Sequence, residues 1–218
     1  MATLLHIDSS IFPVAESASR QVAETFRAAW LQQHPQGRII SRDLAQSPVS
    51  HIDAGAQYAG YVDPAAHSAE QAAAFAERRE LIEELEAADA VLVGAPMHNL
   101  SVPSSLKAWI DNVVLMGRTA MGQATLAGTP VTVIASRGGA YGPGTPRDGF
   151  DYVQNFLQAV FGTLLDMEVD FIVPELTGAP TDPKMAELVP LFEASRERAD
   201  GEATLRGNEL ATHLANAA

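Results

Sequence analysis

The segment Ala90-Val-Leu-Val-Gly-Ala-Pro-Met-His-Asn-Leu100 is followed directly by Ser101-Val-Pro-Ser-Ser-Leu-Lys-Ala-Trp-Ile-Asp111. Its first half is continuously apolar, which is typical of a buried strand, and Pro96 ends that strand. A helix is expected to begin at Pro103, because proline there has its φ already set and gives up only an N–H that would be unpaired. A buried strand that leads through a loop into a helix indicates a parallel α/β sheet, in which ligands bind beyond the carboxyl ends of the strands.

Four further strands are expected around this segment, at residues 3–8, 38–43, 130–136 and 169–174. Helical patterns separate them, from about residue 19, from residue 68 to about 88, from 103 to about 116 and from 150 to 165. Ser68-Ala-Glu-Gln71 resembles a capping box at the start of one of these helices. Residues 44–67 have no clear period and are expected to form a long excursion. A last helical region after residue 183 is expected to be interrupted by Pro190, Gly201 and Gly207.

Five strands that alternate with helices, with no internal repeat, specify an α/β fold in three layers. We therefore predict a doubly wound, parallel, five-stranded sheet. The chain has 218 residues, 47% of them hydrophobic, and no linker-like change in composition divides it. Residues 1–218 are therefore expected to form a single domain with a full core.

The composition argues against several classes of partner and site. The formal net charge is −13, which repels nucleic acid and anionic membrane surfaces, so neither is expected as a partner. There is no cysteine, which excludes disulfides, thiolate metal sites and a cysteine nucleophile. The six histidines are too scattered for a local metal motif, and no metal is expected.

The start of the chain and its apolar runs favour a cytoplasmic protein. Residues 1–8 lack the basic segment and the long apolar core of a signal peptide. The longest uninterrupted apolar run, at residues 90–97, is far shorter than the roughly 20 residues that a membrane helix needs.

The loop after the first strand is rich in serine. Ser17 and Ser19 lie where the first helix begins, and hydroxyl groups there, with the free N–H groups and the helix dipole, favour a phosphate. The dinucleotide fingerprint G-x-G-x-x-G and the nucleoside-triphosphate loop G-x-x-x-x-G-K-[ST] are both missing. A monophosphate is therefore one reading of this loop, and simple helix capping by the serines is the other.

The loops after the third and fourth strands complete the pattern. Gly138 and Gly139 follow the fourth strand directly, and paired glycines let a backbone approach a ligand, although they also suit a flexible turn. In the flavodoxin-like strand order 2-1-3-4-5, the carboxyl ends of the first, third and fourth strands meet at the topological switch point. Three such loops at one edge indicate a single flavin-sized pocket.

The chain resembles the FMN-dependent NADH azoreductases, within the flavodoxin-like NAD(P)H:quinone oxidoreductases, over nearly its whole length. The segments that carry the resemblance are Ser9-Ser10 with Ser17-Ala-Ser19, Arg42-Asp-Leu44, Ala95-Pro-Met-His-Asn99, Pro103-Ser-Ser-Leu-Lys-Ala-Trp-Ile-Asp111 and Ser136-Arg-Gly-Gly139.

This resemblance implies FMN as cofactor and assigns its contacts residue by residue. The phosphate of FMN would be held by Ser10, Ser17, Ala18 and Ser19. The isoalloxazine ring and its N5 side would be bordered by Met97, His98, Asn99 and Leu100. The other edge of the flavin would meet Ser136, Arg137, Gly138 and Gly139. The chemistry would belong to the flavin, so no catalytic side chain is assigned.

The implied activity is two-electron, ping-pong hydride transfer from NADH or NADPH through FMN to a quinone or an aromatic azo compound. The implied assembly is a homodimer whose second subunit completes the pocket. A flavodoxin-like electron carrier that binds FMN without oxidising NAD(P)H is the main alternative, and a relative without FMN is a third. Neither alternative requires a different fold.

Overall fold

The computed structural model describes residues 2–121 and 124–217 of the chain. Its sheet contains five parallel strands in the order β2-β1-β3-β4-β5, as predicted. The strands are β1 (Thr3–Asp8), β2 (Arg38–Asp43), β3 (Ala90–Gly94), β4 (Pro130–Ile134) and β5 (Glu168–Ile172). The chain order reverses next to β1, which creates a topological switch point between the carboxyl ends of β1 and β3.

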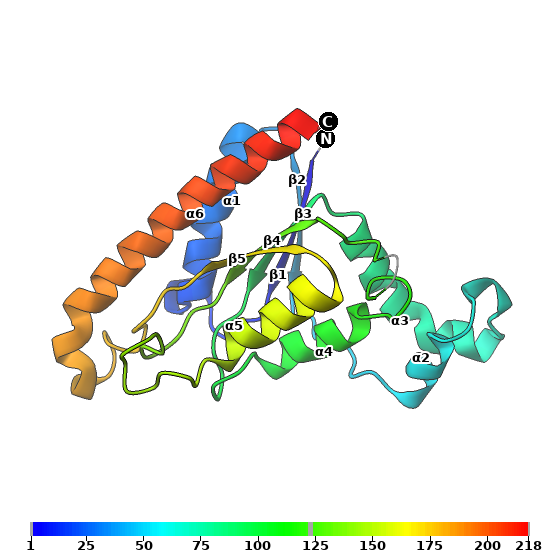
Figure 1. Cartoon of the computed structure of the whole chain (residues 1–218), viewed down its shortest axis with the longest axis horizontal. Helices are drawn as coiled ribbons and strands as arrows, with labels where there is room; N and C mark the ends of the chain where they lie inside the picture. Colours follow the sequence, from blue (N-terminus) through cyan, green and yellow to red (C-terminus); the bar gives the residue numbers. More distant parts are fainter. Residues whose placement is uncertain (1, 122–123, 218) are drawn as a thin grey trace.

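Helices cover both faces of this sheet. The α-helices are α1 (Ala18–Gln33), α2 (Ala54–Ala59), α3 (Ala69–Glu86), α4 (Ser104–Val113), α5 (Tyr152–Leu157) and α6 (Val189–Ala217). Shorter helical segments are η1 (Val14–Glu16), η2 (Pro64–Ala66), η3 (Gln158–Leu164) and η4 (Pro183–Leu188). Figure 1 shows α1 and α6 side by side on one face, and α3, α4 and α5 on the other. The segment around α2 extends beyond α3, away from the sheet.

Successive side chains of β1 point to opposite faces of the sheet and pack into two separate hydrophobic clusters. Leu4 points to the side of α1 and α6, where it packs in one cluster with Phe26. Leu5, the next residue, belongs to the cluster on the opposite face together with Phe75 and Trp109. All of these side chains are almost completely buried, and each buried large apolar side chain contributes about 1.5–3 kcal/mol to folding.

The last helix differs from its prediction, because α6 runs without interruption through Pro190, Gly201 and Gly207. Pro190 is the second residue of α6, a position where the missing N–H would have no helical partner anyway. At Gly207 a Cβ atom would lie 2.7 Å from the carbonyl oxygen of Phe26. That glycine therefore permits the close packing of α6 on α1 instead of ending the helix.

Other local predictions have mixed outcomes. The capping box is confirmed: the Ser68 hydroxyl accepts from the Gln71 amide, and the Gln71 side chain accepts from the Ser68 amide. Pro103 is the N-cap of α4, one position before the expected one. The helix expected over residues 150–165 is divided between α5 and the π-helical η3. The excursion at residues 44–67 contains the short helices α2 and η2.

No helix within residues 2–121 and 124–217 has both the length and the apolar character that a membrane span requires.

Candidate functional site

A cavity of about 690 Å³ lies at the carboxyl edge of the sheet, within the range of roughly 300–1,000 Å³ that is usual for ligand sites. Its walls come from the loops that follow β1, β3, β4 and β5, and from the first turns of α1 and α6. Seven of the residues predicted for the cofactor line it: Ser10, Ser17, Ala18, Met97, His98, Ser136 and Gly138. The three loops that the sequence singled out thus meet in one cavity.

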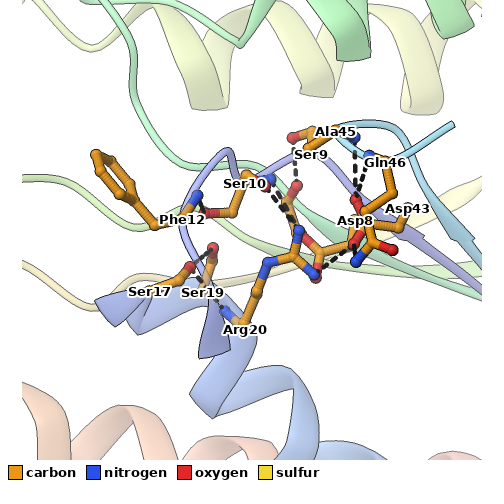
Figure 2. Close-up of polar contacts among 11 residues, drawn as sticks. Asp8, Ser9, Ser10, Phe12, Ser17, Ser19, Arg20, Asp43, Ala45 and Gln46 are labelled. Carbon is orange, nitrogen blue, oxygen red and sulfur yellow. Dashed lines mark hydrogen bonds and ion pairs between the residues drawn. The ribbon is translucent and has the colours of Figure 1, made fainter. Parts of the chain in front are cut away.

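The phosphate loop, which we define as residues 9–17, forms the wall nearest to α1. Ser17 is the N-cap of α1, and its hydroxyl accepts a hydrogen bond of 3.3 Å from the Arg20 amide. Ser19 is fully buried beside the cavity, and its hydroxyl lies 3.2 Å from that of Ser17 (Figure 2). The hydroxyl groups of Ser17 and Ser19 are therefore gathered at the start of α1.

The start of α1 also offers free backbone donors. The amides of Ala18 and Ser19 donate to no residue in the part of the chain that the structure describes. They are the first two residues of a helix of 16 residues, so the helix dipole adds a partial positive charge there. Two free N–H groups, neighbouring hydroxyls and a helix N-terminus together form a donor set that suits a phosphate.

The loop after β3 makes a tight turn. The amide of His98 donates to the carbonyl of Ser101 at 2.8 Å, and the amide of Ser101 donates back to His98 at 3.0 Å. The two residues between them, Asn99 and Leu100, have φ values of +50° and +70°. Positive φ at both central residues is the geometry of a type I′ turn, which is costly for leucine.

This turn divides the predicted flavin contacts into two groups. Met97 and His98 line the cavity, whereas Asn99 faces a neighbouring hollow of about 500 Å³ that His98 also borders. Leu100 lines neither of these two spaces. Met97 is joined to the next loop, because its amide donates to the Ser136 carbonyl at 2.8 Å.

In the loop after β4 the two glycines have different surroundings. A Cβ atom at Gly138 would meet nothing within 4 Å, so its backbone faces open space in the cavity. A Cβ atom at Gly139 would come within 2.9 Å of Nη1 of Arg147. Gly138 therefore leaves room that a flat ligand edge needs, and Gly139 makes room for a side chain of the protein itself.

Arg137 is directed away from the cavity. Its guanidinium is almost completely buried, forms an ion pair of 2.8 Å with Asp151 and donates to the Gln154 side chain at 2.6 Å. Glu175 lies 3.8 Å from the same guanidinium. These contacts anchor the loop after β4 to α5 and to the segment after β5.

Sequence reasoning missed the loop after β5 and the start of α6. The additional lining residues from these segments are Thr177, Gly178, Pro180, Thr181, Phe192 and Arg196. The amide of Gly178 donates to the Gly138 carbonyl at 3.2 Å, which brings this loop against the one after β4. Residues 174–183 contain three prolines and a glycine directly after a strand, a signal that could have revealed a fourth loop at the same edge.

Within the part of the chain that the structure describes, no three histidine, aspartate or glutamate side chains are grouped so that they could hold a metal ion.

Comparisons with known proteins agree with this geometry. A family model described as flavodoxin-like fold matches residues 2–189. The FMN-dependent NADH:quinone oxidoreductase of Streptomyces avermitilis is 62% identical over 216 residues, which cover 99% of this chain and 100% of that protein. The FMN-dependent NADH:quinone oxidoreductase of Streptomyces coelicolor is 59% identical over 214 residues, or 98% and 97% of the two chains.

Solved structures share the fold at much lower sequence identity. An azoreductase from Bacillus anthracis superposes with a TM-score of 0.81 at 20% identity, covering 96% of this chain and 100% of that one. An FMN-dependent NADH-azoreductase from the same species, in complex with FMN, gives a TM-score of 0.77 at 20% identity, covering 97% and 100%. With the family match and the high identity to its relatives, this chain belongs to the family of FMN-dependent NADH:quinone oxidoreductases and has the flavodoxin-like fold.

Proposed function

We infer that this chain is an FMN-dependent NADH:quinone oxidoreductase. The observation that carries the inference is the cavity at the carboxyl edge of the sheet, which is lined both by the free donors at the start of α1 and by the open backbone of Gly138. Relatives that are 62% and 59% identical over almost the whole chain carry the same name.

The donor set at α1 fits the phosphate of FMN. We propose that the hydroxyls of Ser10 and Ser17 and the amides of Ala18 and Ser19 hold it, with the Ser19 hydroxyl supporting that of Ser17. One phosphate site fits FMN better than FAD, because the pyrophosphate of FAD usually demands a glycine-rich turn that this sequence lacks. Neutral and partly charged donors allow an anion to bind in spite of the net charge of −13.

The remaining walls would hold the isoalloxazine ring. Bound FMN supplies the chemistry that accepts a hydride from NADH or NADPH and passes it on. The protein would orient the ring between two loops, which are residues 97–100 and 136–139. Met97, His98, Ser136 and Gly138 would touch it from the cavity wall, and Asn99, Leu100, Arg137 and Gly139 would act through their backbone.

Both proposed classes of acceptor are flat, namely quinones and aromatic azo compounds. Phe12 lines the cavity with about half of its side chain exposed, so it offers a face on which such a molecule could stack. Residues 1–218 are proposed to act as one domain, since α6 packs along α1 and brings Phe192 and Arg196 to the same cavity.

We further propose that the protein works in the cytoplasm as a homodimer. Large apolar side chains that are about half exposed or more support a self-association surface: Tyr58, Tyr61, Phe150 and Tyr152. Tyr58 and Tyr61 belong to the segment around α2 that extends beyond α3 (Figure 1), where a second subunit could cover them.

The test is identification of the cofactor and of the donor. Denaturation of the purified protein should release FMN, and the protein should oxidise NADH when benzoquinone is present. Release of FAD, or of no flavin after reconstitution with FMN, would contradict the proposal. FMN without NADH oxidation would instead identify an electron carrier.

A further inference from the structure

We propose that Arg20 is a positioning residue that holds the phosphate loop in the shape that receives the phosphate of FMN. Arg20 does not line the cavity, so it would act through Ser10 and Ser17. The inference rests on the proposed function, because it concerns the same phosphate.

One side chain joins three parts of the chain at this point (Figure 2). Nη2 of Arg20 donates to the carbonyl oxygen of Ser10 at 2.7 Å. Nη1 lies 3.0 Å from Asp8, at the end of β1, and 2.8 Å from Asp43, at the end of β2. Only 12% of the Arg20 side chain is exposed, so water competes little for these contacts.

Arg20 contacts both serine-bearing ends of the phosphate loop. Its guanidinium holds Ser10, and its backbone amide donates to the hydroxyl of Ser17 at 3.3 Å. The two hydroxyls that line the cavity are therefore tied to a single residue of the first turn of α1. The amide bond to Ser17 is the N-cap bond of α1, whereas the bond to the Ser10 carbonyl depends on the arginine side chain.

Ser10 is held from both sides of its backbone. Its amide donates to Oδ1 of Asp8 at 3.0 Å, while its carbonyl accepts from Arg20. Burial raises the pKa of Asp8, whereas the bond from the Ser10 amide and the charge of Arg20 act against that rise. The Ser10 hydroxyl accepts from the Phe12 amide at 3.3 Å, which leaves its own proton to donate at the cavity wall.

We call the contacts of Arg20 with Asp8, Ser10 and Asp43 the Arg20 clamp. Asp43 extends this clamp to the turn after β2. Oδ1 of Asp43 accepts from the amides of Ala45 and Gln46 at 3.0 and 3.2 Å. Burial alone would raise the pKa of Asp43, but the bonds from Arg20 and from these amides bring it below its usual value. Asp43, from the segment Arg42-Asp43-Leu44, would thus act at the cofactor site although it does not line the cavity.

The test compares FMN with riboflavin, which carries the same ring and ribityl chain but no phosphate. Affinities of both ligands are measured for the apoprotein of the wild type, Arg20→Gln and Arg20→Lys. Loss of the clamp should weaken FMN by about tenfold or more, since hydrogen bonds to charged groups are among the stronger ones. Riboflavin affinity should change by less than about twofold, because the ring is proposed to lie between residues 97–100 and 136–139, away from the contacts that Arg20 makes with Ser10 and Ser17.

The Arg20→Lys variant distinguishes the effect of the hydrogen-bond geometry of the guanidinium from the effect of its positive charge. A lysine keeps the positive charge but cannot hold Asp8, Asp43 and the Ser10 carbonyl at once, so it should resemble Arg20→Gln. Full FMN affinity in Arg20→Lys would overturn the proposal, and so would equal losses of FMN and riboflavin in Arg20→Gln. If Arg20→Gln does not fold, the same two affinities are measured for Asp43→Asn. A ratio of FMN to riboflavin affinity equal to that of the wild type would then overturn the proposal.

Arg118→Gln is the matched control. Arg118 forms a two-pronged ion pair with Glu86 at 2.9 and 2.6 Å, remote from the phosphate loop in sequence and lining no part of the cavity. Its loss should lower the melting temperature but leave the ratio of the two affinities at the wild-type value. A wild-type protein that binds neither ligand would contradict the proposed function itself, which separates that failure from a failure of the clamp.

Discussion

The backbone amide of Met97 donates a hydrogen bond of 2.8 Å to the carbonyl oxygen of Ser136, just beyond the ends of β3 and β4. The next connection along the same edge joins the Arg137 amide to the Pro174 carbonyl at 3.0 Å. The ladder of the sheet therefore continues into the loops that form the cavity. Side chains of these loops are thus presented by a rigid frame, and their replacement should affect the ligand more than the fold.

Gly138→Val should fold normally and lose FMN. A Cβ atom there meets nothing within 4 Å in the protein and φ is not positive, so the protein leaves room for the first added carbon. We expect the valine side chain to occupy space that the flavin needs. The measurement is flavin content and melting temperature of the apoprotein. Gly201→Ala is the control, since it also has open space but lies in α6, and it should gain up to about 1 kcal/mol of stability. Full flavin content and quinone reduction in Gly138→Val would exclude this cavity as the flavin site.

Replacement of Ser17 and Ser19 together by alanine should weaken FMN binding by about 10- to 10²-fold. The variant loses the hydrogen bond from the Ser17 hydroxyl to the phosphate, at roughly 1.5–3 kcal/mol for a bond to a charged group, together with the Ser19 hydroxyl that supports it. Loss of the N-cap at Ser17 should also cost about 1 kcal/mol of stability. Fluorescence titration of the apoprotein with FMN gives the affinity. Wild-type affinity for FMN in the double variant would show that these serines only cap the helix and do not bind the phosphate.

Arg137→Gln should destabilise the protein by about 3–5 kcal/mol, because it leaves the carboxylate of Asp151 in a largely buried place without its partner. Urea unfolding of the apoprotein measures this loss. Flavin affinity should fall only through loosening of the loop after β4, since the guanidinium is directed away from the cavity. A variant with full stability and greatly reduced FMN affinity would mean that the guanidinium contacts the flavin directly.

Stability should fall in weak acid because of His6. Burial, followed by the charges of Arg27 and Arg20, lowers the pKa of His6 from 6.5 to about 3. The folded protein therefore keeps His6 neutral, while the unfolded chain takes up a proton below pH 6.5. Stability from this group is complete above pH 6.5 and is lost as the pH falls towards 3, at up to about 1.4 kcal/mol per pH unit.

Urea unfolding of wild type and His6→Asn at pH 7 and pH 5 checks this expectation. The wild type should lose about 2 kcal/mol more than the variant between these values. His213→Asn, which removes an exposed histidine of α6, should follow the wild type. Equal losses in all three proteins would show that His6 is not the group responsible.

Much of this architecture follows from local sequence patterns. The apolar run of β3 and the alternation of strands with helices were enough to predict a parallel sheet, because parallel strands are buried on both faces. Its order, 2-1-3-4-5, was taken from the flavodoxin-like fold. The capping box at Ser68 and Gln71 was predictable down to its two hydrogen bonds, since both lie within four residues.

The failures arise where distant parts of the chain meet. Gly207 was expected to break a helix, but its role is set by the carbonyl of Phe26 in α1, which no local pattern reveals. Arg137 stays a predicted flavin contact through its backbone, but the direction of its side chain is set by Asp151 and Gln154, which no local pattern reveals. Arg196 reaches the cavity only because α6 packs on α1.

Anaerobic stopped-flow mixing of the FMN-loaded protein with NADH tests the central claim most directly. The account predicts that NADH alone removes the absorbance of the oxidised flavin, and that a second mixing with benzoquinone restores it. The Gly138→Val variant, which is expected not to bind FMN, is mixed with the same excess of FMN. Its absorbance change gives the reaction of NADH with free flavin, which is subtracted. No loss of absorbance with NADH or NADPH unless a separate reductase is added would contradict the account and identify an electron carrier.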